Sequence, residues 1–243
     1  MKLYVIGIGP GSPSQITPQA LHAMQESQVI VGYTVYVDLV RPLFPNKEYI
    51  TTAMKREEDR CRMAVDRALQ GSNVAVVCSG DSGVYGMAGL VLTMAQGTGL
   101  DVEIIPGMTA ATTGAALLGA PLTHDFAVIS LSDLLTPLAT IEKRLECAAE
   151  ADFVIVLYNP MSHKRRDYLQ KACDIILKYR DPQTPAGFAR NIGRDGEEGF
   201  VLPLGELRNA QVDMFTTVFI GNSHSRVIDG KLVTPRGYGV EGV

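Results

Sequence analysis

Short apolar runs alternate with amphipathic segments along the first half of the chain. Strands are predicted at residues 3–8, 28–32, 48–51, 73–79 and 102–105. Helices are predicted at residues 17–27, 34–41, 56–70, 84–96 and 108–118. The run Val74-Ala75-Val76-Val77-Cys78 has no polar interruption, which is typical of a strand covered on both faces. This alternation predicts an α/β fold with a parallel sheet.

The pattern begins again after a connector at residues 119–125. Strands are predicted at residues 126–131, 152–158, 185–190, 199–204 and 215–221, and helices at residues 137–149 and 164–179. Because the last strands follow one another with little helix between them, the second sheet is expected to be mixed. We therefore predict two α/β lobes, residues 1–119 with a parallel sheet and residues 120–243 with a mixed sheet.

Composition narrows the class of protein. Of 243 residues, 46% are hydrophobic and 20% charged, and the formal net charge of −4 disfavours nucleic acid as a partner. No apolar run approaches the roughly 18 residues of a membrane span and no signal-peptide pattern is present, so we expect a soluble cytoplasmic protein. The four cysteines form no CxxC pair, so neither a disulfide framework nor a metal site is expected, and Cys78 is expected in the core.

The first predicted strand leads into the turn Gly7-Ile8-Gly9-Pro10-Gly11. Such a turn exposes backbone N–H groups and lets a ligand press on the main chain. The glycine spacing differs from the Gly-x-Gly-x-x-Gly of dinucleotide-binding proteins, and the second predicted strand ends without an acidic residue. A nucleotide-like ligand is therefore expected, while a nucleotide-dependent oxidoreductase is the weaker alternative.

Two more glycine-rich loops follow predicted strands, where ligands bind in open α/β sheets. In Ser79-Gly80-Asp81-Ser82-Gly83-Val84-Tyr85-Gly86, the Asp81 carboxylate either accepts hydrogen bonds from a ligand or caps a helix starting near Val84. In Ile105-Pro106-Gly107-Met108-Thr109-Ala110, a helix opens at Thr109, whose hydroxyl either faces a ligand or caps the helix.

The second half offers further loops and a few acid–base candidates. Tyr158-Asn159-Pro160 and Ile220-Gly221-Asn222 each end a predicted strand. The pair His124-Asp125 lies on the connector, and Ser130, Ser132 and Asp133 follow the strand predicted at 126–131. Because no Gly-x-Ser-x-Gly sequence is present, a serine hydrolase is not favoured.

Taken in order, Gly-Ile-Gly-Pro-Gly, Gly-Asp-Ser-Gly-Val-Tyr-Gly, Pro-Gly-Met-Thr-Ala, Tyr-Asn-Pro and Ile-Gly-Asn resemble the tetrapyrrole methylase family over essentially the whole chain. The family comprises S-adenosylmethionine-dependent enzymes of corrin and sirohaem synthesis. The resemblance implies two α/β domains, S-adenosylmethionine bound in the cleft between them, a tetrapyrrole substrate and a homodimer.

Other segments resemble the precorrin-3B C(17)-methyltransferase branch, which methylates ring carbon 17 and contracts the macrocycle. They are Gly32-Tyr33-Thr34-Val35-Tyr36, His124-Asp125-Phe126, residues 129–137 and Thr234-Pro235-Arg236-Gly237-Tyr238. The stretch at residues 80–89 is closer to the anaerobic branch, whose substrate is cobalt-factor III. A methylase acting on another ring carbon and a non-catalytic metabolite-binding module are the remaining alternatives.

The resemblance also implies roles for individual residues. Cofactor contacts would fall on Gly9, Pro10, Ser79, Gly80, Asp81, Val84, Thr109 and Ala110, with weaker matches at Ser130, Asn159 and Arg190. The base for ring contraction would be Asp133, His124 or Asp125, unless His124 and Asp125 only stabilise the connector. Substrate carboxylates would meet basic residues among Arg41, Lys55, Arg56, Lys164, Arg165 and Arg190, and any cobalt would arrive inside the macrocycle.

Overall fold

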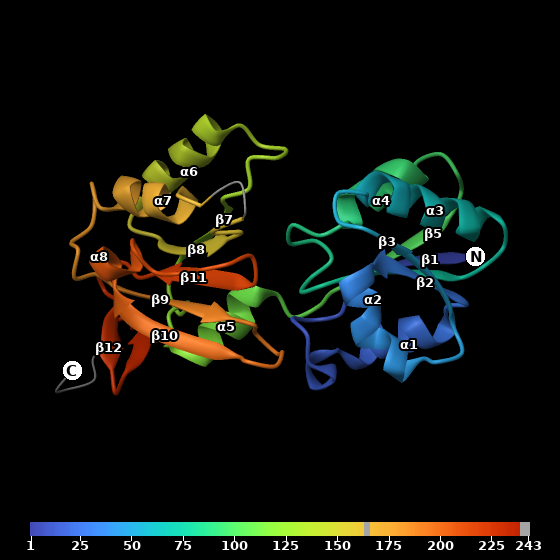
Figure 1. The fold of residues 1–243 in the computed structure, drawn as a ribbon, viewed down its shortest axis with the longest axis horizontal. Helices are drawn as coiled ribbons and strands as arrows, with labels where there is room; N and C mark the ends of the chain where they lie inside the picture. The colour runs from blue at the N-terminus through green and yellow to red at the C-terminus, as the bar shows by residue number, and fades with distance from the viewer. Residues whose placement is uncertain (163–165, 239–243) are drawn as a thin grey trace. The chain divides into compact units, whose positions relative to one another are not determined.

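The computed structural model describes residues 1–162 and 166–238, and the chain divides into two compact units, Met1–Ala110 and Ala111–Val243 (Figure 1). The division falls earlier than the expected boundary at residues 119 and 120, because helix α5 (Ala110–Leu118) packs in the second unit. A Cβ added to Gly114 of α5 would lie 2.9 Å from the ring of Phe219, and Leu118 lies against Gly187. Lys164 and Arg165, two of the expected carboxylate partners, lie outside the described residues.

The first unit is built on a five-stranded sheet in the order β3-β2-β4-β1-β5. Every neighbouring pair is parallel, which confirms the predicted parallel sheet. Its strands are β1 (Lys2–Gly7), β2 (Val29–Tyr33), β3 (Glu48–Thr52), β4 (Val74–Cys78) and β5 (Asp101–Ile105). Strands β4, β1 and β5 are neighbours, so the loops that follow them leave the sheet side by side.

Helices cover both faces of this sheet (Figure 1). Alternate residues of the central strands face opposite helix layers. Leu3, Val5 and Val76 face one layer, and Tyr4, Ile6 and Val77 face the other. The first layer consists of α3 (Glu57–Leu69) and α4 (Ala88–Ala95), and the second of α1 (Pro18–Glu26) and α2 (Thr34–Val40). Burial on both faces explains the continuous apolar run of β4.

The second unit has a five-stranded sheet in the order β10-β9-β11-β8-β7. The β7–β8 pair is parallel and the other pairs are antiparallel, which confirms the predicted mixed sheet. Its strands are β7 (Phe126–Ser130), β8 (Val154–Tyr158), β9 (Pro185–Arg190), β10 (Glu198–Pro203) and β11 (Thr216–Ile220). One face is covered by α6 (Leu138–Glu150), α7 (Tyr168–Ile176) and α8 (Leu204–Leu207), and α5 packs on the opposite face.

A small third sheet was not predicted. It has the order β12-β13-β6 and contains the hairpin β12 (Arg226–Ile228) and β13 (Lys231–Val233) with the two-residue strand β6 (Gly119–Ala120). Part of the expected connector is therefore a strand, because it pairs in parallel with residues more than a hundred positions further along the chain.

Buried cysteines belong to the core, as expected for Cys78, which is only 4% exposed. Desolvation by burial raises the pKa of its thiol to about 11, so the thiolate needed for nucleophilic chemistry is disfavoured. Cys61 and Cys173 are also buried and Cys147 is exposed, and all four are free thiols. Among residues 1–162 and 166–238, no helix is both long and apolar enough to cross a membrane.

Candidate functional site

Three glycine-rich loops of the first unit, residues 8–12, 79–87 and 106–109, cross one another beyond the ends of β1, β4 and β5. We call this arrangement the glycine crossing. Gly9 and Gly80 form a two-way bridge, in which Gly9 N–H donates to Gly80 O at 3.1 Å and Gly80 N–H donates to Gly9 O at 2.7 Å. A Cβ on Gly107 would lie 2.2 Å from Gly80 O, and one on Gly7 would lie 2.6 Å from Gly107 N. The main chains therefore approach too closely for side chains at these positions.

The Asp81 carboxylate binds backbone N–H groups within the glycine crossing. Oδ1 accepts from the N–H groups of Gly83 at 2.7 Å and Val84 at 3.0 Å, and Oδ2 accepts from Gly107 N–H at 2.9 Å. Three of the roughly four acceptor positions of a carboxylate are thus used by the main chain. Asp81 therefore links the loop after β4 to the loop after β5 and holds the backbones of both loops in place.

The helix predicted at residues 84–96 begins later, at Ala88. Tyr85 has a φ of 53°, outside the right-handed helical region, and Ala88 N–H donates to Ser82 O to close the loop. The Ser82 hydroxyl, which is fully buried, donates to Ile105 O at 3.1 Å and ties the same loop to β5. The predicted start was wrong because these contacts hold residues 83–87 in turns.

Gly80 is less crowded than Gly7 and Gly107. It has a φ of 70°, and an added Cβ would make ordinary van der Waals contact with Thr109 Cα at 3.8 Å. Gly80 is partly exposed, so a ligand can approach its backbone without a side chain to exclude it. All of the first-unit residues predicted to contact cofactor lie in or next to the crossing, namely Gly9, Pro10, Ser79, Gly80, Asp81, Val84, Thr109 and Ala110.

The second unit brings Ser130, Asn159 and Arg190 to one edge of its sheet, because β7, β8 and β9 all end there. We call this the second-unit edge. The Ser130 hydroxyl accepts hydrogen bonds from Asn159 Nδ2 at 3.0 Å and from Ser132 N–H at 3.2 Å. Asn159 has a φ of 54°, a left-handed conformation that asparagine tolerates better than most residues. These contacts fix the loops after β7 and β8 against each other.

The arginine at this edge is bound by its neighbours. Arg190 donates to Gln211 O, and its guanidinium lies 3.6 Å from Glu198 and 3.9 Å from Asp213. Its charge is thus balanced within the second unit.

The other expected carboxylate partners lie in the first unit. Arg41 lies 4.2 Å from the ring centre of Tyr49 and 3.8 Å from Asp38, and Arg56 pairs with Asp59. Lys55 is exposed.

Asp133 lies three residues beyond β7 and receives a hydrogen bond from the hydroxyl of Tyr168, with 2.7 Å between the oxygen atoms. Tyr168 is the first residue of α7 and packs against the core of the second unit. Tyr168 was not among the predicted site residues. No motif marks it, and the 35 positions between it and Asp133 give no sequence signal for the contact.

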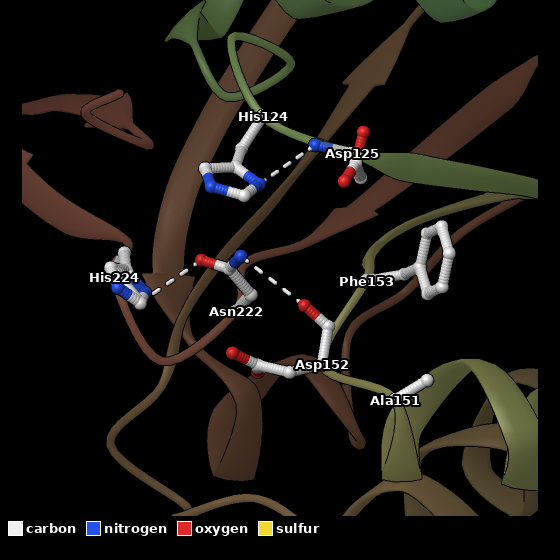
Figure 2. Close-up of a pocket in the computed structure, with 7 residues that line it drawn as sticks. All are labelled: His124, Asp125, Ala151, Asp152, Phe153, Asn222 and His224. Atoms are coloured by element: carbon white, nitrogen blue, oxygen red, sulfur yellow. Dashed lines mark hydrogen bonds between the residues drawn. The ribbon is translucent and has the colours of Figure 1, made fainter. Parts of the chain in front are cut away.

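His124 and Asp125 lie at the opposite edge of the same sheet, before β7 begins. They line a cavity of about 150 Å³ together with Ala151, Asp152, Phe153, Asn222 and His224 (Figure 2). The whole of β7 separates them from Asp133, a distance of roughly 15 Å for a five-residue strand. The structure therefore does not bring the three base candidates together.

Several hydrogen bonds join residues that line this cavity (Figure 2). His124 Nδ1 accepts from Asp125 N–H at 2.9 Å, and Asn222 Nδ2 donates to Asp152 O at 3.2 Å. Burial alone would raise the pKa of the Asp152 carboxyl, but two hydrogen bonds from Ser223 and the charge of Arg180 outweigh burial and hold that pKa below its ordinary value. These contacts support a structural role for this edge.

No group of three or more His, Cys, Asp or Glu side chains in the described part of the chain is arranged to hold a metal ion. The glycine crossing is made of backbone amides, the Ser82 hydroxyl and the Asp81 carboxylate. The second-unit edge carries hydroxyls, the Asp133 carboxylate bound by Tyr168 and the paired Arg190.

Comparison with known proteins places these features in a family. The family model "Tetrapyrrole (Corrin/Porphyrin) Methylases" matches residues 2–208. The "Probable cobalt-factor III C(17)-methyltransferase" of Salmonella typhimurium (strain LT2) is 49% identical, with 97% of this chain and 99% of that protein covered. The "Precorrin-3B C(17)-methyltransferase" of Sinorhizobium sp. is 40% identical, with 97% and 96% covered.

Among solved structures, the methyltransferase CobJ superimposes with a TM-score of 0.89 at 35% identity. The superposition covers 96% of this chain and 99% of CobJ. Likeness over nearly the full length of both chains confirms the expected fold, with its parallel first sheet and mixed second sheet. The chain belongs to the tetrapyrrole (corrin/porphyrin) methylase family.

Proposed function

We propose that this protein transfers a methyl group from S-adenosylmethionine to carbon 17 of cobalt-factor III during corrin synthesis, with contraction of the macrocycle. Precorrin-3B is the alternative substrate. The observation that carries the proposal is full-length similarity, at 49% and 40% identity, to two proteins named for methyl transfer to this carbon. The glycine spacing and the family membership both oppose the oxidoreductase alternative.

The glycine crossing fits the proposed cofactor because it presents backbone where a side chain would fill the space. Gly80 is partly exposed beside Thr109 and presents main chain, with no side chain, to a ligand. Bound S-adenosylmethionine supplies an electrophilic methyl group on sulfur. The crossing would hold its polar ends through backbone N–H and C=O groups, while the Asp81 carboxylate fixes the loop that presents them.

Methyl transfer from a sulfonium needs little acid–base help, so positioning is the main contribution of the protein to that step. Ring contraction also requires the proton of a hydroxyl group to leave, and a placed base contributes about 10²–10⁴-fold to such a step. We assign this role to Asp133, because its carboxylate is held by Tyr168 at the second-unit edge. Ser130, Asn159 and Arg190 at the same edge stay predicted cofactor contacts.

The test is methyl transfer from isotopically labelled S-adenosylmethionine to cobalt-factor III and, in parallel, to metal-free precorrin-3B. Mass spectrometry of the products shows whether one methyl group is added, and NMR locates it on the ring. Label at carbon 17 with the cobalt substrate supports the proposal. Label at another ring carbon, or no transfer to either substrate, overturns it.

Family resemblance also underlies two smaller proposals, a cytoplasmic location and a homodimer. Size-exclusion chromatography with light scattering gives the particle mass directly. Twice the chain mass of 26.2 kDa supports the dimer, and a single chain mass contradicts it. Cell fractionation tests the location, since enrichment in the membrane fraction would contradict it.

A further inference from the structure

The loop after β7 carries Asp133 and then two exposed leucines. Leu134 is 64% exposed and Leu135 is 99% exposed, so packing contributes little to holding this part of the loop. On its other side, the loop is tied to the sheet by the hydrogen bond from Ser132 N–H to the Ser130 hydroxyl. The position of the Asp133 carboxylate therefore depends on its polar contacts.

Tyr168 offers a rigid contact for that carboxylate. Its ring packs against the second-unit core, and the next residues of α7 that face the core, Leu169 and Ala172, are 3% and 1% exposed. A tyrosine anchored in this way has few rotamers to lose, so its hydroxyl is fixed by the helix. From there it donates to Asp133 Oδ2 at 2.7 Å.

We propose that Tyr168 is a positioning residue, whose hydroxyl orients the Asp133 carboxylate to take the proton released in ring contraction. The inference rests on the proposed function, in which Asp133 is the base. Locking the carboxylate in one orientation is what proton transfer within hydrogen-bond reach requires.

Two charged side chains, Asp167 just before α7 and Lys171 within it, also lie near Tyr168. Lys171 Nζ lies 5.6 Å from the centre of the Tyr168 ring and pairs with Asp167 at 2.7 Å. Lys171 and Asp167 therefore balance each other's charge beside the Tyr168 ring.

The test substitution is Tyr168→Phe, which keeps the ring in the core and removes only the hydroxyl. Tyr179→Phe, at an exposed position just beyond α7, is the matched control. We expect Tyr168→Phe to lower kcat for ring-contracted product about tenfold, as for one hydrogen bond to a charged group. KM and S-adenosylhomocysteine affinity should stay within about twofold of wild type.

A double-mutant cycle with Asp133→Asn separates a positioning role from a structural one. If Tyr168 acts through Asp133, Tyr168→Phe has no further effect on kcat in the Asp133→Asn background. Full additivity, or a Tyr168→Phe enzyme that matches Tyr179→Phe in kcat and KM, overturns the inference. If Asp133→Asn itself leaves ring contraction unchanged, the assignment of Asp133 in the proposed function fails first, so the two failures are distinguishable.

Discussion

Replacing Asp81 by asparagine tests whether the carboxylate builds the glycine crossing or binds the ligand. Asn keeps the size of the side chain but removes its charge and turns one acceptor into a donor. The better orientation keeps an oxygen at Oδ1, where Gly83 and Val84 donate, and places the amide NH₂ against Gly107 N–H. One hydrogen bond is then replaced by a contact between two donors, and the other two are weakened.

The size of the effect follows from these three contacts. A hydrogen bond to a charged group contributes roughly 1.5–3 kcal/mol, and a lost partner adds the desolvation of the group left behind. Asp81 is only half-buried, and water can reach the N–H groups of Gly83 and Val84, which are exposed, so their share is reduced. We expect Asp81→Asn to lower the free energy of unfolding by about 2–3 kcal/mol and to weaken S-adenosylhomocysteine binding as the loops loosen.

Urea unfolding at neutral pH measures the first effect, and calorimetric titration with S-adenosylhomocysteine measures the second. Asp66→Asn, at an exposed position of α3, is the control for a change of one charge and should alter neither. If Asp81→Asn abolishes ligand binding while the unfolding curve matches wild type, the carboxylate contacts the ligand directly and its role in building the crossing is refuted.

Three further predictions test other parts of the structure. Gly107→Ala should lower the free energy of unfolding in urea by about 3 kcal/mol or more, because its Cβ would meet Gly80 O at 2.2 Å. Gly80→Ala, whose Cβ would make only ordinary van der Waals contacts, should cost only about 1 kcal/mol for its positive φ, and equal costs would contradict the crossing. Asp152→Asn should lower stability at neutral pH, and the difference from wild type should shrink as pH falls below 3.8. Because its pKa is lowered in the folded state, the Asp152 carboxylate stabilises the fold above its unfolded pKa, and this stabilisation is lost as the carboxylate is protonated. A stability difference between Asp152→Asn and wild type that grows toward low pH would contradict this. A thiol reagent at pH 8 should label Cys147 in the native protein and reach Cys61, Cys78 and Cys173 only after unfolding, and mass spectrometry of peptides would reveal any other order.

Much of the fold could be predicted because its signals are local. The unbroken apolar run at Val74–Cys78 marks a strand covered on both faces, and strand–helix alternation marks a parallel sheet. The glycine-rich loops after strands also predicted that these loops would meet beyond one edge of the first sheet, since the carboxyl ends of neighbouring parallel strands lie there.

The remaining features depend on contacts between distant residues. Gly107 N–H bonds to Asp81 across 26 positions. The Ser82 hydroxyl bonds to Ile105 O across 23 positions, and this contact helps delay the start of α4. Strand β6 exists only because β13 pairs with it, and Tyr168 meets Asp133 only in the folded second unit. His124 and Asp125 are close to Asp133 in sequence, yet strand geometry carries them to the opposite edge.

Hydrogen–deuterium exchange with and without S-adenosylhomocysteine tests most directly whether backbone amides of the glycine crossing bind the cofactor. We expect ligand-dependent protection in peptides covering residues 8–12, 79–87 and 106–110 together, since these loops share hydrogen bonds and glycine contacts. Protection confined to other segments, or none at saturating ligand, would contradict cofactor binding at the crossing.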